Sequence, residues 1–335
     1  MNNEVYVAGR PIGNNFPPFV IAEAGSNFNQ DFDTARRLID VAAQSGAQAV
    51  KFQLFRADLL YPDRGGIYEI FKSIELNPDW VPSLNEHAES QGIIFMASAF
   101  DRTSIDVLES INIVAHKIAS SEVTNLGFLH YVASKARPII ISTGMCDMVD
   151  IQEAVNVCRA VGNTQIILLQ CGAMYPLPTE MANLRVINTL VEVFGCPVGL
   201  SDHTLGDFVA PVAVGLGAGI FEKHFTLDRT AKGPDHFYAL EPRELKSYID
   251  SLNEAYRSLG GGVKELLPQE KELGRREGLY ISRDMRIGEV IDTSDIQIRR
   301  PALGLRARYA PMICGATIAK SLKRDDPITW DSISF

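Results

Sequence analysis

The stretch GIFEKHFTLD (residues 219–228) has the pattern of a buried β-strand that nevertheless carries charged side chains. Side chains alternate between the two faces of a strand, so Glu222 and His224 share one face while Lys223 lies on the other. A buried carboxylate and a buried imidazole both need partners, which a metal ion, a ligand or other charged groups can supply. The fold that surrounds this strand decides which partner is present.

Other apolar segments of similar length precede this one, and amphipathic helical segments separate them. The eight candidate strands are residues 19–25, 49–55, 93–100, 113–120, 138–144, 165–172, 196–202 and 219–226. Eight strands alternating with helices over about 260 residues predict an α/β fold, the (β/α)₈ TIM barrel. A doubly wound sheet is the main alternative. It is disfavoured because the first strand is followed by EAGSNFNQDFD, which has no GxGxxG turn.

The pattern changes after the segment SLGGGVKELLPQEKELGRREG (residues 258–278), where short β-like pieces replace the alternation of helix and strand. We therefore predict a catalytic barrel domain over residues 1–262, a linker over 263–278 and a small β-rich domain over 279–335. A module this small gains stability by docking on another surface.

The composition describes a folded globular chain, with 46% hydrophobic and 22% charged residues among 335. No apolar run approaches the roughly 20 residues of a membrane span, and the start of the chain lacks the pattern of a secretory signal. We therefore expect a cytoplasmic protein.

The five cysteines form no CxxC pair, which indicates reduced thiols. A net charge of -9 argues against nucleic acid or an anionic membrane as a partner.

Polar residues gather where each predicted strand ends, which in a TIM barrel is the catalytic face. They are Glu23, Lys51, Gln53, Ser98, Lys117, Ser120, Ser142, Thr143, Tyr175, Ser201, His203, Glu222 and His224. Some of the serine and threonine residues have a second interpretation as N-caps of the following helices, above all Ser142, Thr143 and Thr204.

His203 and His224 end adjacent strands, so their imidazoles can converge on one metal ion, with Glu222 and Asp202 close by. Two imidazole ligands leave most of the coordination sphere open for a substrate oxygen and water. Imidazole alone does not choose among Mn, Fe, Co and Zn.

Lys51 and Lys117 are placed near the barrel centre, where an unpaired ammonium group is strongly disfavoured. One interpretation is internal salt bridges to Glu23 and Glu122. The other is a phosphate or carboxylate ligand held by both lysines, with serine hydroxyls as donors. Lys223 points to the opposite face and is expected to form a structural salt bridge.

Several motifs together resemble the sialic acid synthase family, in order and spacing over nearly the whole chain. They are FVIAEAGSNFN, AVKFQLF, HKIASSE, IISTGM, YPLP, NLRVI, GLSDHT, FEKHFTLD and KGPDH. The tail, with LYISRDMRIGEVI and IQIRRPALG, is similar to the antifreeze-protein-like (SAF) module of those enzymes.

The resemblance implies condensation of phosphoenolpyruvate with an N-acetylmannosamine-type sugar, giving a nine-carbon 2-keto acid and phosphate. By motif match, His203 and His224 would hold a divalent metal, commonly Mn or Mg, with Co or Zn also possible, and Glu23 would be the acid/base. The residues implied for phosphoenolpyruvate are Lys51, Ser98, Lys117, Ser120, Ser142 and Ser201. Those implied for the sugar are Tyr175, Glu222, Asp235 and Arg300.

The family pattern also implies a domain-swapped homodimer, in which Arg300 from the tail module of one protomer reaches the sugar of the other. The residues Gly172 and Ala173 replace polar residues that are usual before Tyr-Pro in the family. The segment GPDHFYALEP is more similar to the sialic and legionaminic branch than to the pseudaminic one.

Two other classes of function stay open. One is a different barrel enzyme, such as a Schiff-base aldolase or another phosphoenolpyruvate-dependent synthase, and the other is a catalytically silent sugar-binding barrel.

Overall fold

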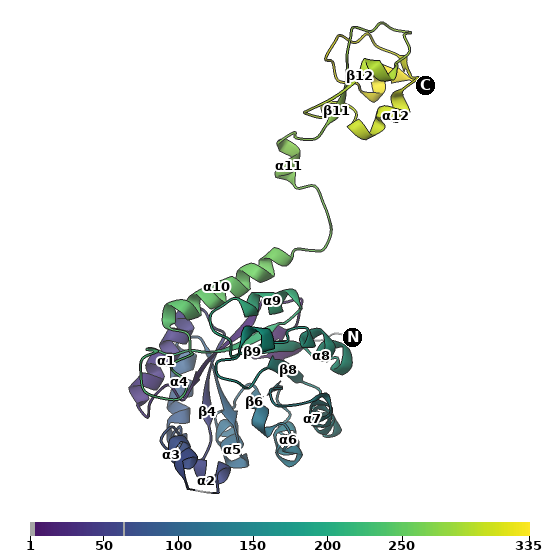
Figure 1. Cartoon of the computed structure of the whole chain (residues 1–335). Helices are drawn as coiled ribbons and strands as arrows, with labels where there is room; N and C mark the ends of the chain where they lie inside the picture. Colours follow the sequence, from purple (N-terminus) through teal and green to yellow (C-terminus); the bar gives the residue numbers. More distant parts are fainter. Residues whose placement is uncertain (1–3, 63) are drawn as a thin grey trace. The chain divides into compact units, whose positions relative to one another are not determined.

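The computed structural model describes residues 4–62 and 64–335, and within them eight parallel strands close into a barrel (Figure 1). The strands are β3 (Phe19–Gly25), β4 (Ala49–Leu54), β5 (Ile94–Ala99), β6 (His116–Ile118), β7 (Ile139–Ser142), β8 (Ile166–Cys171), β9 (Val198–Asp202) and β10 (Ile220–His224). They follow one another around the barrel in sequence order, and β10 closes it against β3. The predicted TIM barrel is confirmed, with each strand inside its predicted segment.

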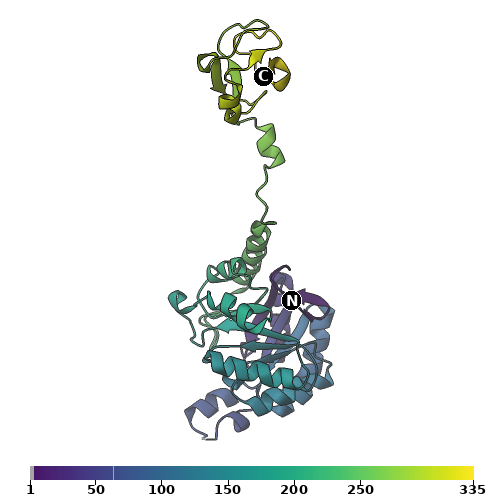
Figure 2. The same cartoon turned by 90° about the vertical axis from the view of Figure 1, so that its right-hand side faces the viewer.

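Helices follow the strands and surround them on the outside, as the two views in Figures 1 and 2 show. The longer ones are α1 (Phe32–Ser45), α4 (Val81–Ser90), α5 (Arg102–Ser110), α6 (Leu126–Ala133), α7 (Met148–Ala160), α8 (Val186–Phe194), α9 (Val209–Gly215) and α10 (Pro242–Leu259). Sequence signals set their ends. In α1 the Asp31 side chain caps the first turn, and Gly46 ends the helix at φ 89°.

Short helical pieces occupy the loops that follow several strands. They are α2 (Ala57–Leu60), α3 (Gly66–Lys72) and η1 (Pro78–Trp80) after β4, η2 (Ser120–Glu122) after β6 and η3 (Thr179–Met181) after β8. The segment from α2 to α3 contributes to the wall of the cavity described below.

An N-terminal hairpin of β1 (Val5–Val7) and β2 (Arg10–Ile12) was not predicted from the sequence. Its turn at Ala8 and Gly9 has positive φ at both residues, as a tight hairpin requires. Side chains of the hairpin pack with apolar residues of the barrel interior in one buried cluster.

The interior of the barrel is apolar at one level and polar at the next. On β3 the inward position passes from Ile21 to Glu23, and on β10 it passes from Ile220 to Glu222 and His224. The strand register pairs Glu23 with His224 and with Lys51, so the polar residues lie at similar heights. A polar layer at the carboxyl ends of the strands is where TIM barrels carry their active sites.

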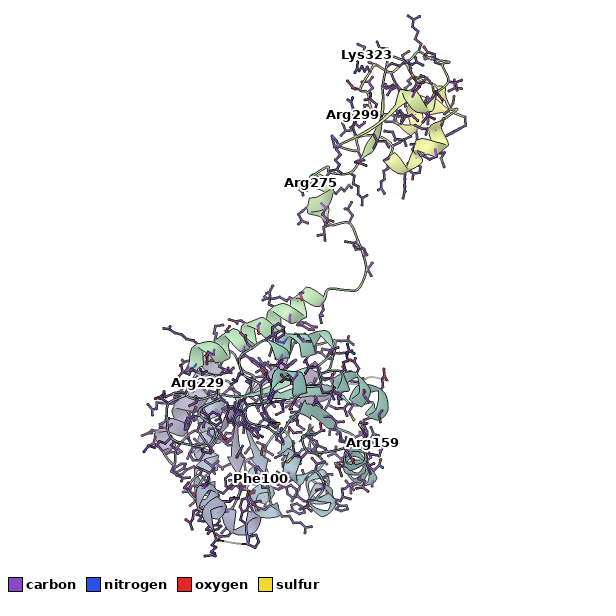
Figure 3. All side chains as sticks on the ribbon, in the orientation of Figure 1. Phe100, Arg159, Arg229, Arg275, Arg299 and Lys323 are labelled. Atoms are coloured by element: carbon purple, nitrogen blue, oxygen red, sulfur yellow. The ribbon has the colours of Figure 1, made fainter. Side chains whose placement is uncertain are left out.

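The described part of the chain divides into two compact units, Met1–Gly260 and Gly261–Phe335. The second unit contains α11 (Pro268–Glu272), β11 (Gly278–Ile281), η4 (Thr293–Asp295), β12 (Ile296–Arg299), η5 (Ala307–Tyr309), α12 (Ala310–Ile313), β13 (Thr317–Ile318), η6 (Trp330–Ser332) and β14 (Ile333–Ser334). It has a hydrophobic cluster of its own, including Leu279, Ile281 and Ile313. Figure 3 shows the side chains of each unit, with Phe100 just after β5 and Arg299 on β12.

None of the helices in the described residues combines the length and the apolar character needed to cross a membrane.

Candidate active site

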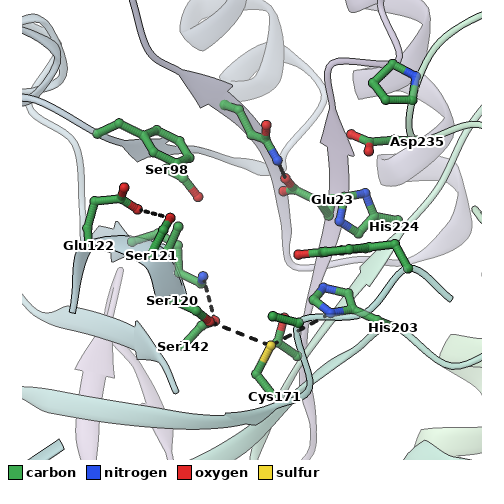
Figure 4. A pocket seen from close by; sticks show the side chains of 18 of the residues that line it. Glu23, Ser98, Ser120, Ser121, Glu122, Ser142, Cys171, His203, His224 and Asp235 are labelled. Atoms are coloured by element: carbon green, nitrogen blue, oxygen red, sulfur yellow. Dashed lines mark hydrogen bonds between the residues drawn. The ribbon is translucent and has the colours of Figure 1, made fainter. Parts of the chain in front are cut away.

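A cavity of about 530 Å³ opens at the carboxyl ends of the barrel strands (Figure 4). Every predicted site residue of the barrel lines it: Glu23, Lys51, Ser98, Lys117, Ser120, Ser142, Tyr175, Ser201, His203, Glu222, His224 and Asp235. Its volume is in the range of small-molecule sites. The structure therefore brings these predicted residues together around one space.

Lys51 lies on the floor of this cavity and is buried together with its partners. Its Nζ atom is 2.6 Å from Oε2 of Glu23 and 3.6 Å from Oε2 of Glu222, and it donates a hydrogen bond of 2.8 Å to Ser98 Oγ. The predicted internal salt bridge between Lys51 and Glu23 is thus present. It does not close the space above the lysine, because Lys51 still lines the cavity.

Lys117 approaches the same carboxylate from the opposite side of the barrel. Its Nζ atom lies 3.5 Å from Oε1 of Glu222 and donates to Ser142 Oγ at 2.8 Å. Ser201 Oγ donates to the same Glu222 oxygen at 3.0 Å. Glu122, the second carboxylate considered as a partner for the lysines, is not the one that pairs with Lys117: β6 faces β10 across the barrel, so Glu222 takes that place.

Burial and neighbouring charges shift the pKa values of Glu23 and Glu222 in opposite directions. For Glu23 burial dominates over the attraction of Lys51 and raises the pKa to about 7. For Glu222 burial also acts to raise the pKa, but Lys117 and Lys51 together outweigh burial and lower the pKa to about 2. Near neutral pH Glu222 is therefore ionised, while Glu23 can hold or release a proton.

The two lysines differ in how well their charge is compensated. Burial acts to lower the pKa of Lys51, but Glu222 and Glu23 outweigh it and the pKa is raised. For Lys117 burial prevails over the attraction of Glu222, and the pKa is lowered. An anionic ligand would therefore stabilise the charged form of Lys117 more than that of Lys51.

His203 and His224 have ring centroids 5.6 Å apart, and Figure 4 shows both at the same side of the cavity. The Nδ1 atom of His203 lies 2.8 Å from the Gly172 carbonyl oxygen, so Nδ1 carries a proton that it donates to that oxygen. Burial acts to lower the pKa of His203, but Cys171 and the Gly172 carbonyl outweigh it and the pKa is raised. Burial lowers the pKa of His224 to about 3, so its ring is neutral, as a metal ligand must be.

Among the residues that the structure describes, no group of three or more His, Cys, Asp or Glu side chains is arranged to hold a metal ion. Two imidazoles could supply only part of a coordination sphere, and the other ligands would have to come from substrate and water, as in an open catalytic site. The two histidines do not fit a closed structural metal site.

Aromatic side chains and one acid border the histidines. The Tyr175 ring lies 4.2 Å from the His203 ring and 5.9 Å from the His224 ring. The Tyr238 hydroxyl donates to Asp235 Oδ1 at 2.9 Å and lies 3.4 Å from His224 Nδ1. Burial raises the pKa of both tyrosines, so they stay protonated and their hydroxyl groups can donate hydrogen bonds.

Ser120 contributes from beyond the end of β6, as the alternation of side chains predicts. Its Oγ accepts a hydrogen bond of 2.9 Å from the Gly144 backbone N–H, and it lies 3.8 Å from Cys171 Sγ. A Cβ atom at Gly144 would stand 2.9 Å from that hydroxyl oxygen. Glycine at this position therefore lets the loops after β6 and β7 approach each other.

Asp202 does not lie at the metal pair, which corrects the sequence interpretation. Inward-facing Ser201 precedes it, so Asp202 points out of the barrel and pairs with Lys223 at 3.0 Å. The structural salt bridge expected of Lys223 is confirmed. Asp202 Oδ1 also accepts hydrogen bonds from the backbone N–H and the hydroxyl of Thr204, at 2.9 and 2.7 Å.

Arg300 belongs to the second unit, in which it is exposed and lies 3.4 Å from Glu277. Three other histidines are set apart from the cavity lining: His87 pairs with Asp40 and His116 with Glu109, while His130 lies on α6. His236 also lies outside the cavity lining, and its Nδ1 is 2.7 Å from Thr226 Oγ1.

Further residues line the cavity without having been proposed as ligand-binding residues, among them Gln53, Phe100, Glu122 and Cys171. The sequence had already placed Gln53, two positions after Lys51, at the catalytic face. The same period-two spacing would have indicated Cys171, two positions after inward-facing Leu169. Phe100 and Glu122 lie in loops beyond the strands, so no such signal exists for them.

The NeuB family model matches residues 38–264, and the SAF domain model matches residues 276–334. N,N'-diacetyllegionaminic acid synthase of Legionella pneumophila is 38% identical over 346 residues, covering 97% of each chain. N-acetylneuraminate-9-phosphate synthase of Mus musculus is 31% identical over 97% of this chain and 95% of its own. The solved structure of N-acetylneuraminic acid synthetase from Leptospira borgpetersenii has a TM-score of 0.76 at 33% identity, covering 81% of this chain and 94% of that one.

Proposed function

This chain belongs to the NeuB family and ends in a SAF domain, and from that premise we propose that it condenses phosphoenolpyruvate with an N-acetylmannosamine-type sugar. The products are a nine-carbon 2-keto acid of the sialic or legionaminic type and inorganic phosphate. The observation that carries the proposal is the floor of the cavity, where Lys51 and Lys117 converge with serine hydroxyls beside a proton-exchanging Glu23.

The charges of this floor support the proposed binding of phosphoenolpyruvate. The two ammonium groups now share Glu222, and an arriving phosphate or carboxylate competes with that carboxylate for them. Ser98 and Ser142 already accept hydrogen bonds from the lysines, so their own hydroxyl protons stay available for ligand oxygens. The hydroxyls of Ser120 and Ser201 line the same space.

The reaction needs one nucleophile, one electrophile and one water molecule. The C3 carbon of the enol attacks the sugar aldehyde, which leaves a cationic centre at C2, and water adds there before phosphate leaves with the bridging oxygen. We assign the carboxylate of Glu23 to accept the proton from that water, because its pKa of about 7 suits proton exchange near neutral pH. Glu222, ionised throughout, keeps both lysines charged and in place.

The residues that would hold the divalent metal are His203 and His224, with Mn or Mg the expected ions and Co or Zn as other possibilities. A divalent metal bound there would supply Lewis acidity for the sugar aldehyde. The Gly172 carbonyl orients the His203 ring through Nδ1, and Tyr238 lies against Nδ1 of His224.

Tyr175 and Asp235 are proposed to bind hydroxyl groups of the open-chain sugar, since they lie beside the histidines at the cavity wall, and Glu222 is proposed to do so from the floor. The SAF domain would complete the site in a domain-swapped homodimer, with Arg300 of one protomer reaching the sugar bound by its partner. We infer a cytoplasmic location, because phosphoenolpyruvate is a cytoplasmic metabolite.

A panel of N-acetylated hexosamines incubated with phosphoenolpyruvate and Mn²⁺ tests the proposal, with phosphate release measured and the product identified by mass spectrometry. We expect sugar-dependent phosphate release and a keto acid three carbons longer than the sugar. Borohydride should trap no covalent adduct, because the proposed chemistry forms no Schiff base; a trapped lysine adduct would identify an aldolase instead.

Metal dependence has a test that does not rely on turnover. His224→Ala should lose Mn²⁺ binding, measured by the electron paramagnetic resonance of free Mn²⁺ in an equilibrium titration. Unchanged Mn²⁺ affinity in this variant would refute the assignment of the metal to the histidine pair.

A further inference from the structure

A buried tyrosine stands behind the part of the cavity wall that carries the histidines. Tyr238 is 4% exposed and does not belong to the described lining of the cavity. It follows β10 in the chain, on the segment that also carries Asp235. Backbone hydrogen bonds of 2.9 Å join Leu240 of this segment to His224 and to Thr226, which fixes the segment against the end of β10. The barrel itself therefore sets the position of the Tyr238 side chain.

Tyr238 contacts three residues that do line the cavity. The centroid of its ring lies 5.2 Å from that of His224 and 5.4 Å from that of Tyr175. Its hydroxyl group donates a hydrogen bond of 2.9 Å to Asp235 Oδ1. Figure 4 shows Asp235 and His224 on the same side of the cavity. Tyr238 is thus a shared support for a proposed metal ligand and for two residues proposed to bind the sugar.

The hydroxyl group of Tyr238 has one proton, so its two polar contacts have defined directions. It donates that proton to Asp235, and its oxygen is left to accept from His224, whose Nδ1 atom lies 3.4 Å away. A neutral imidazole has one N–H, so this contact favours the proton on Nδ1 and leaves the lone pair on Nε2. A lone pair on the ring is what a metal ion requires.

The carboxylate of Asp235 depends on the same hydroxyl group for its orientation. Of the two donors that reach Asp235 among the described residues, Tyr238 is the closer, while Ser26 Oγ lies 3.4 Å from Oδ2. A Cβ atom at position 25 would stand 2.9 Å from the same Oδ2, so Gly25 leaves room for the carboxylate beside β3. Without the tyrosine hydroxyl, Asp235 would keep one long hydrogen bond and would be free to turn.

Other contacts hold the floor of the cavity in place. Lys51 donates to Ser98 and Lys117 donates to Ser142, each at 2.8 Å. Within the described part of the chain, the hydroxyl group of Tyr238 makes its hydrogen bonds to Asp235 and His224 and not to these four residues. A change at Tyr238 should therefore affect the metal and the sugar without affecting phosphoenolpyruvate.

We propose that Tyr238 is a positioning residue that joins the metal side of the site to the sugar side, its hydroxyl group accepting from His224 and donating to Asp235. The inference rests on the proposed function and adds to it a residue from outside the cavity lining. Loss of this one hydroxyl group should weaken the binding of the metal and of the sugar together. The packing of the Tyr238 ring against its neighbours is a separate contribution, which a phenylalanine would keep.

Tyr238→Phe removes the hydroxyl group and keeps the ring. The Kd for Mn²⁺, measured without substrates by the electron paramagnetic resonance of free Mn²⁺, should rise about tenfold, the lower end of the cost of losing a partner behind a metal ligand. With Mn²⁺ saturating, the KM for N-acetylmannosamine should also rise about tenfold. The Kd for phosphoenolpyruvate, measured by calorimetry, should stay within about twofold of its original value.

Tyr256→Phe is the matched control. The Tyr256 hydroxyl group also makes a short hydrogen bond, of 2.8 Å to the Asn15 carbonyl oxygen, and Tyr256 is not part of the described cavity lining. This variant should keep the original Kd for Mn²⁺ and the original KM for the sugar. Thermal unfolding followed by circular dichroism should show both variants to be folded.

A spectroscopic test needs no turnover. In metal-free protein labelled with ¹⁵N at histidine, two-bond proton–nitrogen correlation spectra show which ring nitrogen carries the proton. The His224 signal, assigned by its absence from His224→Ala, should show the proton on Nδ1 in the unmodified enzyme. In Tyr238→Phe the signal should move toward the other tautomer.

The outcomes separate this inference from the proposed function. An unchanged Kd for Mn²⁺ in Tyr238→Phe, or a His224 proton on Nε2 in the unmodified enzyme, overturns the link to the metal ligand. An unchanged KM for the sugar overturns the link to Asp235. An equal loss of phosphoenolpyruvate affinity, or the same changes in Tyr256→Phe, would show general loosening and overturn the positioning role.

No sugar-dependent phosphate release from the unmodified enzyme would overturn the proposed function. The Mn²⁺ titration and the histidine spectrum would still decide whether Tyr238 positions His224.

Discussion

At the scale of single residues, the site depends on two buried carboxylates that face the same lysine. Glu23 and Glu222 both approach Lys51, yet burial raises the pKa of one to about 7 while Lys117 and Lys51 lower the pKa of the other to about 2. Carboxyl groups whose environments separate their pKa values have separate tasks. Glu23 exchanges protons, and Glu222 remains a fixed negative charge.

Glu23→Gln tests this division of tasks. Glu23 is mainly protonated below pH 7 and mainly ionised above it, and the ionised form is the proposed base. In the unmodified enzyme kcat/KM should therefore fall with one protonation as the pH drops below about 7. The glutamine variant should lose about 100-fold or more in kcat, and its remaining activity should lack this limb of the pH profile.

Glutamine keeps the size of the side chain, so Mn²⁺ binding serves as the control for an intact site. A pH profile in Glu23→Gln that retains the limb near pH 7 would show that another group is the base.

At the scale of secondary-structure elements, the ends of β9 and β10 are held in register by a buried ion pair outside the barrel. Lys223 contacts Asp202 at 3.0 Å and also donates to the Thr204 carbonyl oxygen, so it clamps the residues on both sides of His203. Lys223 is a positioning residue, since it reaches the site only through the backbone of the β9 loop.

Lys223→Met should loosen this loop and weaken Mn²⁺ binding about tenfold, the usual cost of losing support behind a metal ligand. Lys223→Arg should recover part of the affinity, because it keeps the positive charge. Lys246→Met, which removes an exposed lysine of α10, is the control and should bind Mn²⁺ normally. Equal affinities in all three variants would contradict the positioning role.

Close packing of the same two strands requires glycine at position 199. A Cβ atom there would stand 2.1 Å from the carbonyl oxygen of Ile220, which is backbone and cannot move aside. Gly199→Ala should therefore lower the free energy of unfolding by about 3 kcal/mol.

Chemical denaturation followed by circular dichroism measures this change. Gly215→Ala is the matched control: this residue lies in helix α9 with open space around it, so alanine should be neutral or slightly stabilising. Equal effects of the two substitutions would mean that the approach of β9 to β10 is not tight.

The barrel and much of its site could be predicted because inward positions recur every second residue and turn polar at the end of each strand. The same alternation places Asp202 outside once Ser201 is known to point inward. The partner of Lys117 could not be predicted, since Glu222 comes from the strand across the barrel and no local pattern encodes that distance. The hairpin of β1 and β2 has strands too short to show a period.

At the scale of the whole molecule, the chain combines a barrel that holds the predicted catalytic residues with a small second unit that holds Arg300. Within its own unit Arg300 is exposed and makes one long ion pair with Glu277, so its loss should not disturb folding. We predict that Arg300 serves the sugar bound by the partner protomer of a homodimer.

Arg300→Ala should raise the KM for the acceptor sugar by about tenfold while the Kd for phosphoenolpyruvate stays unchanged. Arg299→Ala is the control, because Arg299 is the neighbouring arginine and pairs with Asp325 on the surface of the same unit. Sedimentation analysis should give a dimer for both variants. Equal losses of sugar and phosphoenolpyruvate binding, or a monomeric protein, would contradict the predicted role.

The most direct measurement of the central claim follows the bridging oxygen of phosphoenolpyruvate. The enzyme is incubated with Mn²⁺, an N-acetylated mannosamine and phosphoenolpyruvate labelled with ¹⁸O at that position, and both products are analysed by mass spectrometry. Water attack at C2 predicts a nine-carbon 2-keto acid and phosphate that carries the label. Label retained in the keto acid, or no sugar-dependent phosphate release from a protein that binds both substrates, would contradict the claim.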